Sequence, residues 1–174
     1  MGLRRSWSSF GATTCRAHGG GGGEGDSTGG PRPGHGKDDW PTLVIESGHS
    51  ESMSYLHLDM QWWFAASQHQ VKIVLLAKFD RSQQAILLER WEEEAPPPRP
   101  GATTTRQAAA LQALLRQQIT ITKNTTSPVS YHVTGGDMVL PFHLLFRRAP
   151  GPQESDLIIS IQDLEEYADV WEVI

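Results

Sequence analysis

The 174-residue chain contains a single cysteine, Cys15, so it has no disulfide framework and no zinc site built from cysteines. It has no run of 18 apolar residues, so no membrane-spanning helix is predicted. Basic residues are also scarce: 15 Lys and Arg against 20 Asp and Glu give a net charge of −5. Proteins that bind nucleic acid normally carry a basic surface stripe, so the charge does not support a nucleic-acid partner. The sequence does not indicate any other partner.

The first 38 residues have little that a core could bury. Residues 19–37 read GGGGGEGDSTGGPRPGHGK, and a chain of this composition is typical of disorder. We therefore predict a disordered Gly-rich tail over residues 1–38 and one folded domain over residues 39–174. Within that domain, residues 92–105 are rich in proline and are predicted to form a linker or loop.

Three interpretations of the extreme N-terminus stay open. It contains three arginines and no acidic residue before Glu24, which is the pattern of a mitochondrial transit peptide. Gly2 and Ser6 also fit an N-myristoylation signal, with Cys15 as a second acylation site. The third interpretation is a solvated tail. No apolar signal core is present, so we expect an intracellular protein, cytoplasmic or nuclear, with mitochondria as the alternative.

Hydrophobic periodicity predicts a mixed β-sheet flanked by helices, in an α/β arrangement with α+β as the alternative. The first half of the domain should contain a strand, a helix, a central strand and its hairpin partner, at residues 42–46, 51–67, 71–79 and 85–91. The second half should contain a helix, a strand, two strands around a Gly-Gly turn and a short strand, at residues 106–118, 119–123, 130–146 and 157–160. Ser160 and Asp163 form a capping box that should start a last helix.

The stretch PTLVIESGHSES, residues 41–52, ends a buried strand on a carboxylate, Glu46, and turns directly into a helix. Ligands of open α/β sheets bind beyond the carboxyl ends of the strands. Glu46 is therefore either a metal ligand or an acceptor for the N-terminus of the next helix. Asp59 lies further along that helix and could face the same crevice as a second site carboxylate.

Several segments carry a family resemblance: PTLVIESGHSES, LHLDMQWWFAAS, VKIVLLAKF, ILLERWE and the ending GGDMVLPFHLLFRRAP…DLIISIQDLEEYADVW. They resemble a family of fungal proteins, most of them without an assigned activity, over roughly residues 40–172. The strand–Glu–Ser–helix unit is in turn similar to the restriction-endonuclease-like PD-(D/E)XK superfamily. The resemblance implies a restriction-endonuclease-like core, with Glu46 as the acidic residue of the (D/E)XK half-motif and a ligand for Mg²⁺ or Mn²⁺.

This chain departs from the superfamily pattern at two points. Gly48 stands where the motif lysine is expected, with Lys72 or Lys78 as substitutes, and no aspartate on a preceding strand is evident. We therefore expect a Mg²⁺-dependent phosphodiesterase relic that is weak or inactive, with Glu46 and Asp59 as candidate catalytic residues. The alternative is a non-catalytic protein-interaction module on the same fold. The acidic run from Glu89 to Glu94 is interpreted as a solvated strand end.

Overall fold

The computed structural model describes residues 6–17, 20–32, 40–96 and 111–168. Seven strands of this part form one mixed sheet, and their order in the sheet follows their order in the sequence. They are β1 (Trp7–Ala17), β2 (Gly21–Pro31), β3 (Leu43–Gly48), β4 (Ile73–Asp80), β5 (Ala85–Glu94), β6 (Gln112–Asn124) and β7 (Ser130–Thr134). Two further strands, β8 (Met138–Leu140) and β9 (Leu157–Ile159), pair with each other.

The centre of the sheet is the unit β3–α2–β4, where α2 spans Met53–Ala66. Strands β3 and β4 are parallel and adjacent, from Leu43 opposite Ile73 to Gly48 opposite Lys78. Ser52 caps the helix by accepting a hydrogen bond from the backbone N–H of Tyr55. The predicted mixed sheet flanked by helices, broadly α/β, is therefore confirmed, as is the helix between two adjacent strands.

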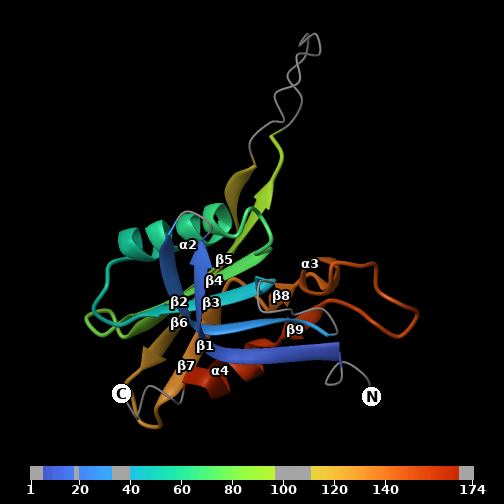
Figure 1. Cartoon of the computed structure of the whole chain (residues 1–174). Coiled ribbons are helices and arrows are strands. Elements are labelled where there is room, and N and C mark those ends of the chain that lie inside the picture. Colours follow the sequence, from blue (N-terminus) through green and yellow to red (C-terminus); the bar gives the residue numbers. More distant parts are fainter. Residues whose placement is uncertain (1–5, 18–19, 33–39, 97–110, 169–174) are drawn as a thin grey trace, which may run out of the picture.

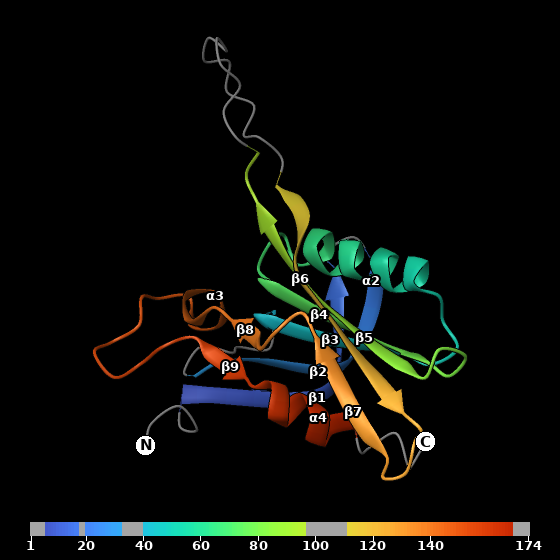
Figure 2. The same cartoon turned by 180° about the vertical axis from the view of Figure 1, so that it is seen from behind.

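Each face of the sheet has its own core. Helix α2 packs on one face, while α3 (Phe142–Phe146), α4 (Ile161–Ala168) and the small sheet lie on the other (Figure 1, Figure 2). The buried core under α2 consists of Trp40, Val44, Leu56, Met60, Trp63, Phe64, Val71, Val74 and Leu76. The opposite core includes Ile73, Ala77, Phe79, Ile86, Ile119, Ile121, Val133, Met138, Leu140, Leu145, Leu164 and Ala168. No helix within the described residues is long and apolar enough to cross a membrane.

The glycine-rich N-terminal region contributes two strands to this sheet. Strand β2 pairs with β1 along its length and with β3 at Ser27–Gly29, in both cases antiparallel. The prediction of a disordered tail is therefore wrong for residues 7–17 and 21–31. Residues 1–5, 18–19 and 33–38 of the predicted tail lie outside the described residues.

The glycines of β2 are needed because tryptophan rings lie against its backbone. A Cβ atom on Gly23 would lie 2.2 Å from Cζ3 of Trp62, and one on Gly29 would lie 2.5 Å from Cζ2 of Trp7. Both distances are far below van der Waals contact, so no larger side chain fits without movement. At these two glycines the apolar surface that covers β2 comes from Trp62 and Trp7.

The second half of the chain differs from its predicted elements in two places. Residues 106–118 contain strong helix formers, yet β6 begins at Gln112 and pairs with β5 along most of its length. Helix propensity is a weak preference that such pairing overrides. Residues 106–110 lie outside the described residues. After Pro141 the chain forms α3 instead of the second strand that was predicted there.

The predicted last helix is confirmed as α4 over residues 161–168. Ser160 and Asp163 exchange the predicted capping hydrogen bonds at its start.

The predicted proline-rich linker starts later than expected. Strand β5 continues to Glu94, so residues 92–94 are sheet, and residues 97–105 lie outside the described residues. Extension of the strand buries Glu92, which is 9% exposed.

The close approach of Gly23 to Trp62 gives a test with a matched control in the same strand. Gly23→Ala should lower the free energy of unfolding by about 1 to 3 kcal/mol, as overpacking does in cores. Gly22→Ala should have little effect, because its Cβ would meet only ordinary contacts at 3.5 Å and beyond. Urea unfolding followed by circular dichroism measures both variants. Equal stability of the two would contradict the packing of β2 on the tryptophan.

Candidate functional site

Glu46 lies near the carboxyl end of β3, with its side chain on the face covered by α2. Alternate residues of a strand point to the same face, and Val44 of β3 is buried in the core under α2. The indole N–H of Trp63, from α2, donates a hydrogen bond to the Glu46 carboxylate. The backbone N–H of Asp26, from β2, donates a second one. Glu46 therefore joins the strand, the helix and the glycine-rich hairpin.

Burial is the main cause of an unusual protonation equilibrium at Glu46. Together with the smaller effect of the negative charges of Asp26 and Asp59, burial raises the pKa of this carboxyl from 4.5 to about 7. The hydrogen bonds from Trp63 and from the Asp26 backbone act in the opposite direction but are outweighed. Near neutral pH, protonated and ionised Glu46 are therefore both populated.

Asp26 is a site residue that the sequence did not reveal. Its Oδ2 accepts hydrogen bonds from the backbone N–H of Ser47, at 2.7 Å, and from the Ser47 hydroxyl, at 2.5 Å. The register that pairs Ser27 with Ile45 places Asp26 beside Glu46. The signal for it in the sequence is the Gly-Glu-Gly-Asp alternation at residues 23–26, which is compatible with a strand but is hidden in a glycine-rich composition.

Asp59 lies one helical turn before Trp63 on α2, and its charge acts on Glu46. Its own pKa is raised, first by partial burial and then by the nearby Glu51. The charges of Asp26 and Asp59 thus both act on Glu46 near the end of β3, and we call these three residues the acidic group. The structure brings together both acids predicted from the sequence, Glu46 and Asp59, and adds Asp26.

Neither candidate lysine supplies an amine to this group. Lys78 is the register partner of Gly48, but its Nζ donates to the carbonyl oxygens of His49, at 2.7 Å, and Phe79, at 3.1 Å. Lys72 precedes β4 and so lies at the opposite end of the parallel pair; its Nζ donates to the His69 carbonyl at 2.6 Å. The side chain of Lys78 therefore leaves β4 on the same sheet face as Glu46, but its amine binds the carbonyls of His49 and Phe79 instead.

A second buried carboxylate, Glu89, lies on the same sheet face, with strand β4 between it and Glu46. Leu76 of β4 is in register with Glu46 on one side and with Glu89 of β5 on the other. Glu89 is only 6% exposed, and its Oε2 interacts with Nε2 of His57 and with the indole N–H of Trp91, both at 2.8 Å. His57 thus binds Glu89 instead of joining the group around Glu46.

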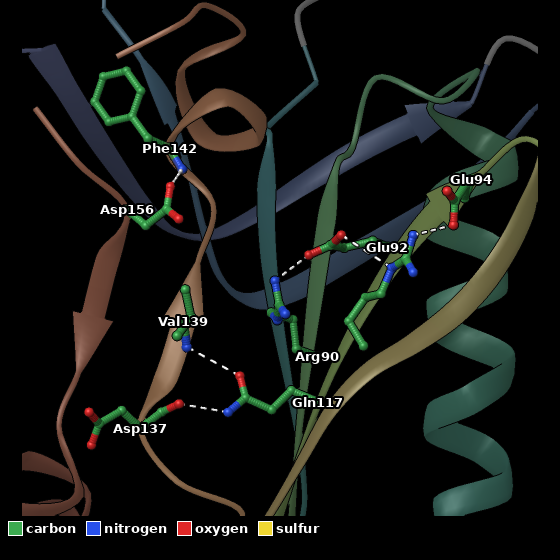
Figure 3. Close-up of polar contacts among 9 residues, drawn as sticks. Arg90, Glu92, Glu94, Gln117, Asp137, Val139, Phe142 and Asp156 are labelled. Carbon is green, nitrogen blue, oxygen red and sulfur yellow. Dashed lines mark hydrogen bonds and ion pairs between the residues drawn. The ribbon is translucent and has the colours of Figure 1, made fainter. Parts of the chain in front are cut away.

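The prediction of a solvated strand end is wrong for Glu89 and Glu92 of β5, whereas Glu94 at the end of the strand is exposed. Besides Glu89, the side chain of Glu92 is buried, and it forms ion pairs with Arg90 and with Arg116 of β6 (Figure 3). Arg116 also pairs with Glu94. Buried acids require such partners, and the partners here come from the same and the neighbouring strand.

The oxygen donors around β3 can provide a small number of ligands for a hard cation. Asp26 and Glu46 are on neighbouring strands, and each engages one carboxylate oxygen in the side-chain hydrogen bonds described above. Within the described residues, no group of three or more His, Cys, Asp or Glu is arranged to hold a metal ion. Mg²⁺ often keeps several waters and binds through one or two carboxylates, so the donor set fits weak binding and not a closed site.

No protein-family model and no curated protein matches this chain. The resemblance to the PD-(D/E)XK superfamily therefore stays a prediction from the residues quoted above.

The raised pKa of Glu46 predicts how stability depends on pH. Because the folded pKa of about 7 exceeds the unfolded value of 4.5, the protonated side chain stabilises the fold. This stabilisation is fully present below the unfolded pKa and is lost as the pH rises through about 7. Glu46→Gln keeps the uncharged shape, so it should match the wild type at pH 4.5 and be more stable by about 1 kcal/mol at pH 8, after discounting for partial exposure.

Denaturant unfolding of wild type and Glu46→Gln between pH 4.5 and 8 measures this difference. Glu166→Gln, at an exposed position on α4 on the other face of the sheet, is the control and should parallel the wild type across the range. A constant difference between wild type and Glu46→Gln at all pH values would contradict a raised pKa.

Proposed function

We propose that this chain is a nuclease-like α/β protein that binds Mg²⁺ or Mn²⁺ weakly at Asp26 and Glu46 and does not cleave phosphodiester bonds. One observation carries the proposal: Asp26 and Glu46 lie on adjacent strands at the end of the parallel pair, and the charges of Asp26 and Asp59 both act on the Glu46 carboxylate. A divalent cation would relieve this repulsion between like charges. Oxygen ligands of this type are those that Mg²⁺ prefers.

A cation bound there would supply the chemistry of a phosphodiesterase, activating a water and neutralising charge on a phosphate. The residues around the site add few of the other groups that phosphodiester cleavage requires. The amine of Lys78, the closest substitute for the motif lysine, is held by two backbone carbonyls. The charged groups that act on the Glu46 pKa, Asp26 and Asp59, are acids, which repel a phosphate backbone. Weak cation binding without turnover is the outcome that this arrangement favours.

A second candidate is a protein-interaction module, and the outer face of α2 favours it. Tyr55 and Leu58 are 65% and 58% exposed although both are large and apolar. They lie on the same helix as Asp59 and Trp63, beside the acidic group, where a nucleic-acid-binding protein would need basic residues. An exposed apolar helix face next to the site is typical of a surface that contacts another protein.

Thermal melts with and without Mn²⁺ test the cation site. A ligand that binds only the folded state stabilises it by about 2.7 kcal/mol at a hundredfold excess over the dissociation constant. The wild type should show such a shift, and Asp26→Asn and Glu46→Gln should lose it. Because protons compete for the Glu46 carboxylate, the shift should be larger at pH 8 than at pH 6.

Glu166→Gln on α4 serves as the control and should respond to Mn²⁺ as the wild type does. An equal Mn²⁺ response of wild type, Asp26→Asn and Glu46→Gln would reject these two residues as ligands. Metal-dependent cleavage of DNA or RNA by the wild type, lost in Glu46→Gln, would show that the site is active and would contradict the second half of the proposal.

A further inference from the structure

The outer face of α2 combines exposed apolar side chains with acids. Tyr55 and Leu58 are three residues apart, so they are neighbours on the helix surface, and both are exposed. Asp59 lies four residues after Tyr55 on the same face. Glu51 lies just before the helix, close enough for its charge to act on Asp59. We call these four residues the α2 patch.

The acids of the α2 patch have no counter-charge. Helix α2 contains no Lys or Arg. Among the described residues, no basic side chain forms an ion pair with Glu51 or Asp59. Instead, the charge of Glu51 raises the pKa of Asp59, in addition to the larger effect of partial burial. A positive group at the α2 patch would relieve this repulsion.

We propose that the α2 patch binds an amphipathic helix of another protein, one whose apolar stripe is bordered by Lys or Arg. The apolar stripe would cover Tyr55 and Leu58, and the basic border would reach Glu51 and Asp59. Packed helices have their axes about 8 to 10 Å apart, so side chains at the border of one helix reach those of the other. The proposal rests on the interaction role that is the second candidate function above, and not on the cation site.

Charge favours such a helix over other occupants. Contact between two copies of this chain through the same patch would bring Glu51 and Asp59 of one copy against those of the other. The other described helices do not supply a basic partner: α3 has only five residues, and α4 carries Asp163, Glu165 and Glu166 without a Lys or Arg. A nucleic acid or an anionic membrane surface would be repelled by the same acids.

A pair of synthetic peptides tests this charge selection. The first is a fluorescein-labelled amphipathic helix of about 15 residues, with leucines on one face and lysines beside them. The second has glutamate in place of each lysine. Fluorescence anisotropy with the full-length protein, in EDTA, measures both affinities. The lysine peptide should bind at least about tenfold more tightly, because its charges complement those of the patch.

Variants of the patch show whether the binding occurs there. Combining Glu51→Lys with Asp59→Lys should reverse the preference, so that the glutamate peptide binds more tightly. Tyr55→Ser and Leu58→Ser should each weaken binding of the lysine peptide by about tenfold or more, as loss of an anchor side chain does. The matched control is Ile158→Ser, since Ile158 is an exposed apolar residue on β9, and it should bind as the wild type does.

Three results would overturn the proposal: no saturable binding of the lysine peptide, equal affinity of the wild type for both peptides, or an unchanged preference in the charge-reversed variant. EDTA keeps the cation site empty of metal during the measurement. A failure here therefore rejects the interaction surface and leaves the Mn²⁺ response of Asp26 and Glu46 as a separate result.

Discussion

The structure depends on the contact between the glycine-rich strand β2 and tryptophan rings on both of its faces. Trp62 of α2 lies where a Cβ of Gly23 would be, and Trp7 lies where a Cβ of Gly29 would be. Aromatic rings bury a large area each, so a strand with few side chains of its own can still be held against the sheet. This contact places the β1–β2 hairpin next to β3 and so completes the side of the sheet on which the acidic group lies.

The hairpin also determines the chemistry of Glu46. With β2 in place, the Asp26 backbone donates a hydrogen bond to the Glu46 carboxylate, which lowers its pKa, but burial under α2 and the repelling charge of Asp26 raise the pKa by more. The result is an acid that changes its charge near neutral pH, among other acids and away from the amine of Lys78. These electrostatics favour a cation over a phosphate backbone, which is why binding without cleavage is the function that the geometry supports best.

Sequence reasoning succeeded where a segment contains its own structural signal. The long apolar β-branched run of β4, the periodicity of α2 and the capping residues Ser160 and Asp163 are local signals, and each predicted its element. It failed where the determining partner is distant in sequence. Strand β2 is held by Trp62, about 40 residues away, and β6 is a strand because β5 pairs with it. Glu89 is buried because His57, 32 residues away, interacts with its carboxylate.

Amide hydrogen exchange over residues 25–29 tests the central claim, that the glycine-rich segment is a sheet strand. Hydrogen-bonded strand amides next to a core exchange slowly, whereas those of an unstructured glycine-rich chain exchange at the intrinsic rate. The structure predicts protection of peptides from β2 comparable with that of peptides from β3, and a loss of this protection in Gly23→Ala. Complete exchange of residues 25–29 at the intrinsic rate, with β3 still protected, would contradict the account.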